Sequence, residues 1–378
     1  MAEWTKYKIS DIGTVVGGAT PSTKKSENYE NGDISWITPK DLSKFCGRYI
    51  KQGERNITET GYRSCSTQLL PRNSVLFSSR APIGYVAIAA KELCTNQGFK
   101  SVIPNENIDP LFLYYLLKYN KHNIESMGSG TTFKEVSANT MRNIIVFVPS
   151  DKRVQEKIAS ILGALDDKIE ENERINNNLL EQASSIYQAW FEDFILSDRS
   201  CPTAWKQGTL AEIADITSGK RPPVKSAEKT DTAIIPIVGA ASVMGYTTEA
   251  NHTDKILVTG RVGTHGVVQR FNLPCWTSDN TLVITSVFYE YTFQILQRIN
   301  YRAMNRGSTQ PLITQSDMNK VPILIPDKET LLKFETLVGQ LMEQYQANLL
   351  ENGKLVELRD VLLPQLMSGE LDVSNLCL

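Results

Sequence analysis

The chain has 378 residues, enough for two or three domains, and its 41% hydrophobic and 22% charged residues are ordinary for a globular protein. The longest apolar run, residues 111–117, is too short to cross a bilayer, and the first ten residues lack a signal-peptide core, so we expect a cytoplasmic protein. The net charge of −2 argues against non-specific nucleic-acid binding over the whole surface. Six scattered cysteines without CxxC spacing and three distant histidines give no support for a metal or redox motif.

The charge is distributed unevenly along the chain. Residues 1–150 carry 18 Lys/Arg against 13 Asp/Glu (net +5), and residues 151–198 carry 5 against 11 (net −6). Residues 199–326 carry 13 against 9 (net +4), and residues 327–378 carry 4 against 9 (net −5). Two mildly basic blocks therefore alternate with two acidic ones, a pattern that a polyanion would feel locally.

The first block, residues 1–150, has the pattern of an α+β domain. Short β-prone runs such as residues 74–77, 85–88 and 144–148 are separated by Gly, Pro and Asn. One amphipathic helix is expected at residues 110–119. We therefore expect a single α+β domain over this block.

A long helix is predicted next, from about Asp151 to Phe194, within the segment 151–198. Apolar residues recur at intervals of three and four from Val154 to Trp190, and no proline interrupts them. Such a helix is roughly 60 Å long at 1.5 Å per residue. A helix of this length with one apolar stripe needs a partner.

The third block, residues 199–326, repeats the first, as four matches in the same order indicate. Each block opens on a Trp followed by an Ile-containing segment and then a glycine, Gly18 or Gly219. Ser79-Arg80 then faces Gly260-Arg261, and Cys94-Thr-Asn-Gln faces Cys275-Trp-Thr-Ser-Asp-Asn. Finally, residues 130–149 align without a gap to residues 307–326. We expect the same α+β domain to be used twice, with its helix at residues 289–302 in the second copy.

The segment 327–378 predicts a second long helix, from about Lys328 to Leu366, followed by a tail. Each long helix could pack on its own domain, but both apolar stripes extend beyond the face of a small domain, so we favour a coiled coil between the two. Both carry an asparagine near mid-length, Asn172 and Asn352. A buried asparagine can fix the register of a helix pair, although a solvated position explains these residues equally well.

The motifs of catalysis that we searched for are absent. The sequence has no GxxxxGK[ST] loop, GxGxxG fingerprint, HExxH, GxSxG or [ND]PP[YF] segment. The acidic pair Asp166-Asp167 lies on the predicted helix, where a solvated face is a better explanation than a metal site.

What both blocks do carry is basic and polar residues in predicted loops. Arg and Lys suit guanine or phosphate, Asn and Gln suit adenine, and Ser and Thr suit phosphate, although each residue alone could be an ordinary surface residue. The candidate DNA-binding residues are Lys24, Thr38, Lys40, Arg80, Asn96, Gln97, Thr131 and Lys134 in the first block, and Lys220, Arg221, Arg261, Thr264, His265, Ser278, Asn280 and Gln310 in the second.

This arrangement resembles the specificity subunit of type I restriction–modification systems. The resemblance covers the whole chain, and its most typical segments are residues 36–41, Arg80 with Gly84, Asn96-Gln97, the helix segment 158–169 and the Leu-rich end at residues 366–369. It implies two target-recognition domains, each reading half of a bipartite asymmetric DNA site, spaced by an antiparallel helix pair. It also implies no catalysis by this chain: two methyltransferase subunits would bring S-adenosylmethionine, and motor–nuclease subunits would use ATP.

The resemblance is weakest in the second block, where Ile235-Pro-Ile-Val-Gly239 is only a loose substitute for Trp36-Ile-Thr-Pro39. Residues shared by both halves, such as Arg80 and Arg261, are expected either to contact DNA phosphates or to support the common scaffold of the domains. Features that differ, such as Asn96-Gln97 against Ser278-Asp-Asn280, are the better candidates for base reading.

Two other classes of function remain open. A protein-interaction scaffold could use the coiled coil only as a spacer between two protein-binding domains. An RNA-binding protein should show aromatic stacking platforms on neighbouring strands, and the sequence shows no such cluster.

Overall fold

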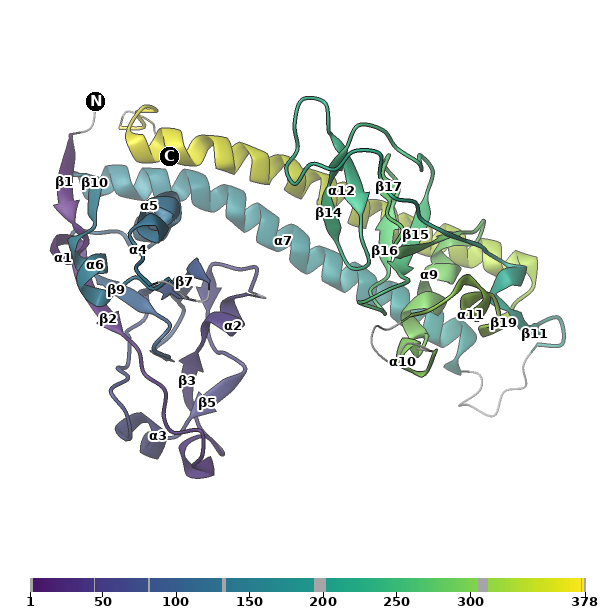
Figure 1. Cartoon of the computed structure of the whole chain (residues 1–378), viewed down its shortest axis with the longest axis horizontal. Helices are drawn as coiled ribbons and strands as arrows, with labels where there is room; N and C mark the ends of the chain where they lie inside the picture. Colours follow the sequence, from purple (N-terminus) through teal and green to yellow (C-terminus); the bar gives the residue numbers. More distant parts are fainter. Residues whose placement is uncertain are drawn as a thin grey trace. The chain divides into compact units, whose positions relative to one another are not determined.

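The computed structural model describes residues 3–43, 45–80, 82–130, 134–193, 202–304, 312–374 and 376. The chain divides into two compact units: unit 1 comprises Met1–Arg174 and Leu349–Leu378, and unit 2 comprises Ile175–Asn348. Each unit holds one globular domain and one half of each long helix (Figure 1). We call the globular part of unit 1 domain 1 (residues 3–151) and that of unit 2 domain 2 (residues 202–327).

Domain 1 is built on a five-stranded sheet, a three-stranded sheet and a two-stranded ribbon. The five-stranded sheet has the order β2-β9-β6-β7-β4, the smaller sheet has the order β5-β3-β8, and the antiparallel ribbon pairs β1 with β10. The strands are β1 (Trp4–Lys8), β2 (Gly13–Gly17), β3 (Ile34–Ile37), β4 (Tyr49–Ile50), β5 (Arg55–Ile57), β6 (Val75–Ser79), β7 (Ile83–Ala89), β8 (Cys94–Thr95), β9 (Lys100–Pro104) and β10 (Ile145–Pro149).

Short helices complete domain 1. The largest, α4 (Pro110–Tyr119), occupies the residues expected from the sequence, and Asp109 caps it by accepting from the backbone N–H of Phe112. The others are α1 (Ile9–Ile12), η1 (Ser26–Asn28), α2 (Pro39–Leu42), α3 (Glu59–Arg63), α5 (Lys121–Ser126) and α6 (Ala138–Asn143). The α4 side chains fill the core beneath the large sheet, with Phe112, Tyr115 and Leu117 fully buried.

Domain 2 repeats this plan. Its sheets have the orders β12-β18-β15-β16 and β14-β13-β17, and its ribbon pairs β11 with β19. The strands are β11 (Lys206–Thr209), β12 (Asp215–Ser218), β13 (Ile235–Val238), β14 (Val243–Thr247), β15 (Ile256–Gly260), β16 (Gln269–Phe271), β17 (Trp276–Thr277), β18 (Thr281–Thr285) and β19 (Pro322–Ile325). The helical elements are η2 (Leu210–Glu212), α9 (Tyr289–Arg298), α10 (Tyr301–Met304) and α11 (Gln315–Asn319).

The internal repeat inferred from the sequence is therefore confirmed in the strand pairing. In each domain, a polar turn follows a short strand, at residues 96–98 after β8 and at residues 278–280 after β17. That short strand pairs in parallel with another strand: β3 with β8, and β13 with β17. Residues 235–238, part of a segment that is a loose match by sequence, thus take the same place as residues 34–37. Gly18 and Gly219 also play one role, because a Cβ at either would lie 2.1 Å from a carbonyl oxygen at or next to that turn, Thr95 or Ser278.

The two long helices are α7 (Lys152–Phe191) and α12 (Lys328–Ser368). In unit 1, the first part of α7 lies beside the last part of α12 (Figure 1), and Asp166 bonds Arg359 while Asn172 bonds Asn352. In unit 2, Asn348 bonds Asn176. Rising numbers on α7 meet falling numbers on α12, so the helices pair antiparallel, and the coiled-coil interpretation is confirmed.

Polar residues inside this pair correct two expectations. Asn172 is fully buried, and its amide donates to Asn352 Oδ1 at 2.8 Å and Glu351 Oε2 at 2.7 Å, so the solvated interpretation of Asn172 is wrong. Asp166 is 5% exposed and bonded to Tyr115 and Arg359, so the solvated-face interpretation is wrong for it as well. Partners on other elements satisfy the Asp166 carboxylate and the NH2 group of Asn172, whereas Asn172 Oδ1 is buried without a hydrogen-bond partner among the described residues.

Candidate nucleic-acid interface

In domain 1, most of the candidate residues meet at one edge formed by strand ends. The backbone N–H of Asn96 donates to Ile37, beside Thr38, and the N–H of Ser79 donates to Gly98. The N–H of Val136 in turn donates to Ser79. These bonds bring together four segments that carry the candidates Thr38, Arg80, Asn96, Gln97 and Lys134. We call this set edge 1.

Edge 1 also contains a cluster of charges around Glu135. Its carboxylate lies 3.2 Å from Lys100 Nζ and 3.7 Å from Arg80 Nη1. Lys100 also donates to Ser79 Oγ at 3.3 Å and is largely buried. Two cations share one carboxylate, which leaves a net positive charge beside the exposed Lys134.

Lys100 and Glu135 were missed by the sequence reasoning. The available signal for Lys100 was its place at the start of a β-prone run, shortly after the Asn96-Gln97 turn. Glu135 adjoins the candidate Lys134, but an acidic residue does not suggest contact with DNA unless its cationic partners are known.

The amide side chains of edge 1 are partly used within the protein. Asn96 Oδ1 accepts from the backbone N–H of Gly98 at 2.8 Å, which closes the turn, and Gln97 Oε1 accepts from Thr20. Thr38 caps α2, and its hydroxyl donates to Asp41 Oδ2 at 2.7 Å. Gln97 is exposed, whereas Asn96 and Thr38 are half-buried.

Domain 2 has an edge with the same pattern of backbone hydrogen bonds, which we call edge 2. The backbone N–H of Ser278 donates to the carbonyl oxygen of Val238. The N–H of Arg261 donates to the carbonyl oxygen of Asn280, and the carbonyl oxygen of Arg261 accepts from the N–H of Ile313. Lys220 joins through its N–H bond to Thr277, as Ala19 does to Thr95 in domain 1. Edge 2 therefore gathers the candidates Lys220, Arg261, Ser278 and Asn280.

The backbone hydrogen bonds show that the sequence match between Arg80 and Arg261 is out of register by one residue. Arg261 donates its backbone N–H to Asn280 and accepts from the N–H of Ile313. In domain 1 the residue that makes the two corresponding bonds, to Gly98 and from Val136, is Ser79 and not Arg80. The two arginines thus lie near equivalent edges but one position apart along the chain.

The candidates in edge 2 and in the loop after Gly260 differ in exposure. Thr264 and Asn280 are exposed, and Ser278 is buried. His265 is half-buried, with Nδ1 at 3.1 Å from the Gly260 carbonyl oxygen. Exposed donors here are thus supplied by Lys220, Thr264 and Asn280.

The other candidates differ in position. Arg221 is exposed and directly follows Lys220 of edge 2, whereas Lys24 is exposed in the segment before η1. Lys40 is exposed and paired with Glu54 at 2.7 Å, and this hydrogen bond raises the pKa of Lys40. Thr131 and Gln310 lie outside the described residues.

The chemistry available at the edges is hydrogen bonding and charge. Among the described residues, no group of His, Cys, Asp and Glu could hold a metal ion. No helix within the described part of the chain is long and apolar enough to cross a membrane.

Comparison with known proteins defines the family. Residues 1–181 and 202–359 match the model of the type I restriction modification DNA specificity domain. The chain belongs to this family of specificity subunits. It is therefore the non-catalytic subunit that recognises a DNA sequence and directs a type I restriction–modification complex to it.

Individual relatives match over almost the whole chain. The type I restriction enzyme MjaIX specificity subunit of Methanocaldococcus jannaschii is 34% identical, over 99% of this chain and 95% of its own length. The EcoprrI specificity subunit of Escherichia coli is 23% identical, over 90% of this chain and 89% of its own. The crystal structure of the specificity subunit from M. genitalium has the same fold, with a TM-score of 0.63 at 18% identity, covering 97% of this chain and 96% of that one.

Proposed function

We propose that domains 1 and 2 each read one half of a bipartite, asymmetric DNA site. The observation that carries this proposal is the shared wiring of the edges: the same backbone bonds present different side chains in the two domains. A common scaffold with different readers is what two unlike half-sites require. The side chains that differ at matching positions are Asn96 against Ser278 and Gln97 against Asp279.

We further propose that the long helices space the domains and hold the partner subunits. The partners are two methyltransferase subunits, which bind S-adenosylmethionine, and motor–nuclease subunits, which use ATP. In support, α12 exposes large apolar side chains in both units, including Leu332 in unit 2 and Leu358 and Val361 in unit 1. Exposed apolar side chains that recur along a long helix favour a protein partner. This role places the protein in the cytoplasm with the host DNA.

Gel-shift assays with and without the methyltransferase subunits test the proposal. We expect a duplex that carries the motif found by methylome sequencing of the host to be bound in preference to a scrambled duplex. Deleting the gene for this chain should abolish methylation of that motif. The purified chain alone should transfer no methyl group. A protein-interaction scaffold would show no motif preference in any of these assays.

A further inference from the structure

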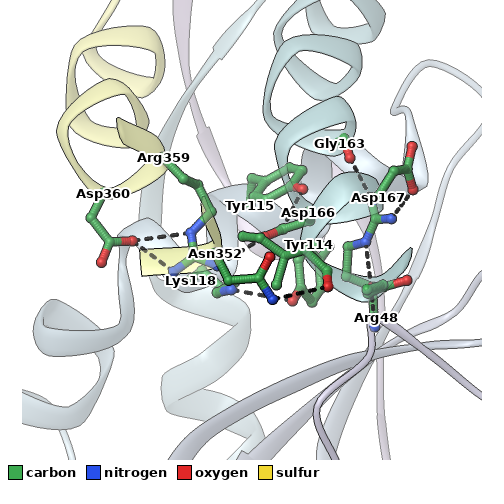
Figure 2. A network of polar contacts seen from close by, with 12 residues as sticks. Arg48, Tyr114, Tyr115, Lys118, Gly163, Asp166, Asp167, Asn352, Arg359 and Asp360 are labelled. Atoms are coloured by element: carbon green, nitrogen blue, oxygen red, sulfur yellow. Dashed lines mark hydrogen bonds and ion pairs between the residues drawn. The ribbon is translucent and has the colours of Figure 1, made fainter. Parts of the chain in front are cut away.

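Domain 1 is tied to the long helix α7 by a buried arginine. Arg48 directly precedes β4, the edge strand of the five-stranded sheet, and its carbonyl oxygen accepts from the N–H of Ile88 at 2.7 Å. The backbone of Arg48 is thus part of the sheet. Its side chain is only 5% exposed and reaches toward α7 (Figure 2).

The guanidinium of Arg48 meets three polar groups along one face of α7. Nη1 donates to the Gly163 carbonyl oxygen at 3.2 Å, Nη2 donates to the Asp167 carboxylate, and Nε donates to Glu170 Oε1 at 2.9 Å. The backbone N–H of Arg48 donates to the same Glu170 oxygen at 3.0 Å. A planar guanidinium bonded at each of its nitrogens resists rotation as well as translation, which a single ammonium contact does not.

The environment keeps this arginine charged. Burial works against the charged form, but the hydrogen bonds that Arg48 donates to Glu170 and Asp167 outweigh it and raise the pKa of Arg48 above its ordinary value. Gly163 provides the clearance, because a Cβ there would lie 3.3 Å from Arg48 Nη1 and 3.1 Å from Leu111 Cδ2. A glycine is unfavourable inside a helix, so this close approach gives it a physical reason.

A second link strengthens the attachment. Asp166 Oδ2 accepts from the Tyr115 hydroxyl of α4 at 2.7 Å, and Asp166 Oδ1 accepts from Arg359 Nη1 of α12 at 2.8 Å (Figure 2). Domain 1 and both long helices therefore meet at one buried carboxylate in unit 1.

Unit 2 attaches its domain differently. The two helices can be compared position by position, because buried residues recur at the same spacing in both: Ile158, Leu162 and Asn172 in α7 correspond to Phe334, Val338 and Asn348 in α12. In this comparison Gly339 of α12 takes the position of Gly163 in α7. A Cβ at Gly339 would have no atom within 4 Å. Domain 2 meets the helices through an aromatic cluster, with Tyr291 4.9 Å from Phe191 and 6.1 Å from Phe334 between ring centroids. It also makes polar contacts: Arg298 Nη2 donates to the Ser184 carbonyl oxygen of α7 at 3.2 Å, and Arg298 Nε lies 2.9 Å from Glu192 Oε1, just after α7.

We propose that Arg48 is a positioning residue for DNA recognition: it fixes the orientation of domain 1 on α7 and thereby sets where the domain 1 half-site must lie along the duplex. The inference rests on the proposed function. Without the guanidinium, domain 1 keeps the core that it shares with α7 and α12, but it loses the contact that fixes its β4 end against α7, so this end can tilt. Domain 1 then reaches its half-site at more than one spacing.

The variants can separate positioning from folding. Arg48→Met removes the guanidinium and keeps the aliphatic stem, and it strands no buried charge, since the side chains of Asp167 and Glu170 are 72% and 34% exposed. The helix-side variant Asp167→Asn/Glu170→Gln removes the same ion pairs without touching domain 1. Arg48→Lys keeps the charge but not the fork. The matched control is Arg270→Met, whose buried arginine bonds Glu290 at 2.6 and 2.7 Å inside domain 2.

The test uses the complex assembled with its methyltransferase subunits. Its dissociation constant is measured for the host motif and for duplexes whose spacer is one base pair longer or shorter. We expect Arg48→Met and the helix-side variant to reduce the preference for the native spacer roughly tenfold, with Arg48→Lys intermediate. Arg270→Met should leave that preference unchanged, even if the overall affinity falls.

The results distinguish three situations. If Arg48→Met and the helix-side variant keep the wild-type spacer preference, Arg48 has only a structural role and the inference is wrong. Should Arg48→Met fail to fold, the helix-side variant decides alone. A wild-type complex without any motif preference would contradict the proposed function instead.

Discussion

At the scale of single residues, the candidate readers differ in how much of their hydrogen-bonding capacity the protein already uses. Recognition of adenine by an amide side chain requires both its oxygen and its NH2 group. Asn96 has committed its oxygen to the turn, whereas Asn280 is exposed. Gln97 is also exposed, and the Thr20 hydroxyl that bonds it can rotate away. We therefore rank Gln97 and Asn280 above Asn96 as base readers.

This ranking gives a prediction about specificity. Gln97→Ala and Asn280→Ala should each relax the preference at one half-site only, by about 1–3 kcal/mol per base contact. Asn96→Ala should also act at one half-site, but through the shape of its turn. The measurement is the dissociation constant of the assembled complex over duplexes substituted one base pair at a time.

The basic residues should behave differently. Arg80→Ala and Arg261→Ala should weaken binding to all duplexes alike and reduce the salt dependence by about one phosphate contact each. Titrations at several salt concentrations measure this slope. An Arg80→Ala variant that switches the methylated motif, beside a Gln97→Ala variant that leaves it untouched, would reverse our assignment.

A buried carboxylate predicts how the stability of unit 2 depends on pH. Glu335 of α12 accepts from the backbone N–H groups of Glu290 and Tyr291 at the start of α9. Burial raises the pKa of Glu335 to about 7, although those two bonds oppose it. The folded form thus holds a proton that the unfolded chain has released above its ordinary pKa of about 4.5. Stability should therefore fall as the pH rises from about 4.5 to 7, by up to about 3 kcal/mol.

Chemical denaturation of the wild type and Glu335→Gln between pH 5 and 8 measures this effect. The glutamine keeps an acceptor oxygen but cannot ionise, so the difference between the two proteins isolates the carboxylate from other titrating groups. We expect the fall in stability to be smaller in Glu335→Gln. Parallel pH profiles would show that the carboxylate is effectively solvated.

At the scale of the elements, the paired helices carry one asparagine contact in each unit. Asn172 meets Asn352 in unit 1, and Asn176 meets Asn348 in unit 2. Asn172→Ala and Asn352→Ala should each cost about 1–2 kcal/mol of unfolding free energy, because a buried amide loses its partner. The double variant should cost less than the sum, since both groups are then removed together.

A double-mutant cycle by chemical denaturation tests this coupling. Asn177 lies on the exposed side of α7, so Asn177→Ala serves as the control and should change stability little. Additive costs at Asn172 and Asn352 would mean that the two amides act independently.

The elements themselves were largely predictable, and the contacts between them were not. Apolar periodicity defined α4 to the residue and α7 to within three residues at its end, because long amphipathic patterns depend on local spacing. The burial of Asp166 depends on Tyr115 and Arg359, which are distant in sequence. The one-residue shift between Arg80 and Arg261 depends on hydrogen-bond register, which matching letters cannot reveal.

At the scale of the whole molecule, the same limit applies to the reading edges. The repeat and its order could be found from the sequence, because four matches recur. Which loops meet could not, since Lys100 reaches the edge through strand pairing and Glu135 through the hydrogen bond from the N–H of Val136 to the Ser79 carbonyl oxygen. The assignment of DNA contacts therefore remains a prediction, whereas the family and the two-domain plan are established.

The last prediction concerns the spacer. α7 and α12 are each continuous, and the division between the units falls after Arg174 in α7 and after Asn348 in α12. One heptad inserted at each of these two points leaves every contact inside either unit intact, and the inserted segments can pair with each other. A heptad keeps the apolar stripe in phase, whereas two residues would rotate it out of the seam.

Seven residues add roughly 10 Å of helix at 1.5 Å per residue, which corresponds to about three base pairs at 3.4 Å each. Three added base pairs also rotate one half-site relative to the other by roughly 100° about the duplex axis. Because this rotation works against the full extension, we expect the spacer to lengthen by at most about three base pairs. We expect methylome sequencing to show a longer unspecified spacer between two unchanged half-site sequences. The control is a single insertion in α7, which should impair assembly because the paired helices then differ in length. An active double-insertion variant with the original spacer would show that the helices do not set the separation of the half-sites.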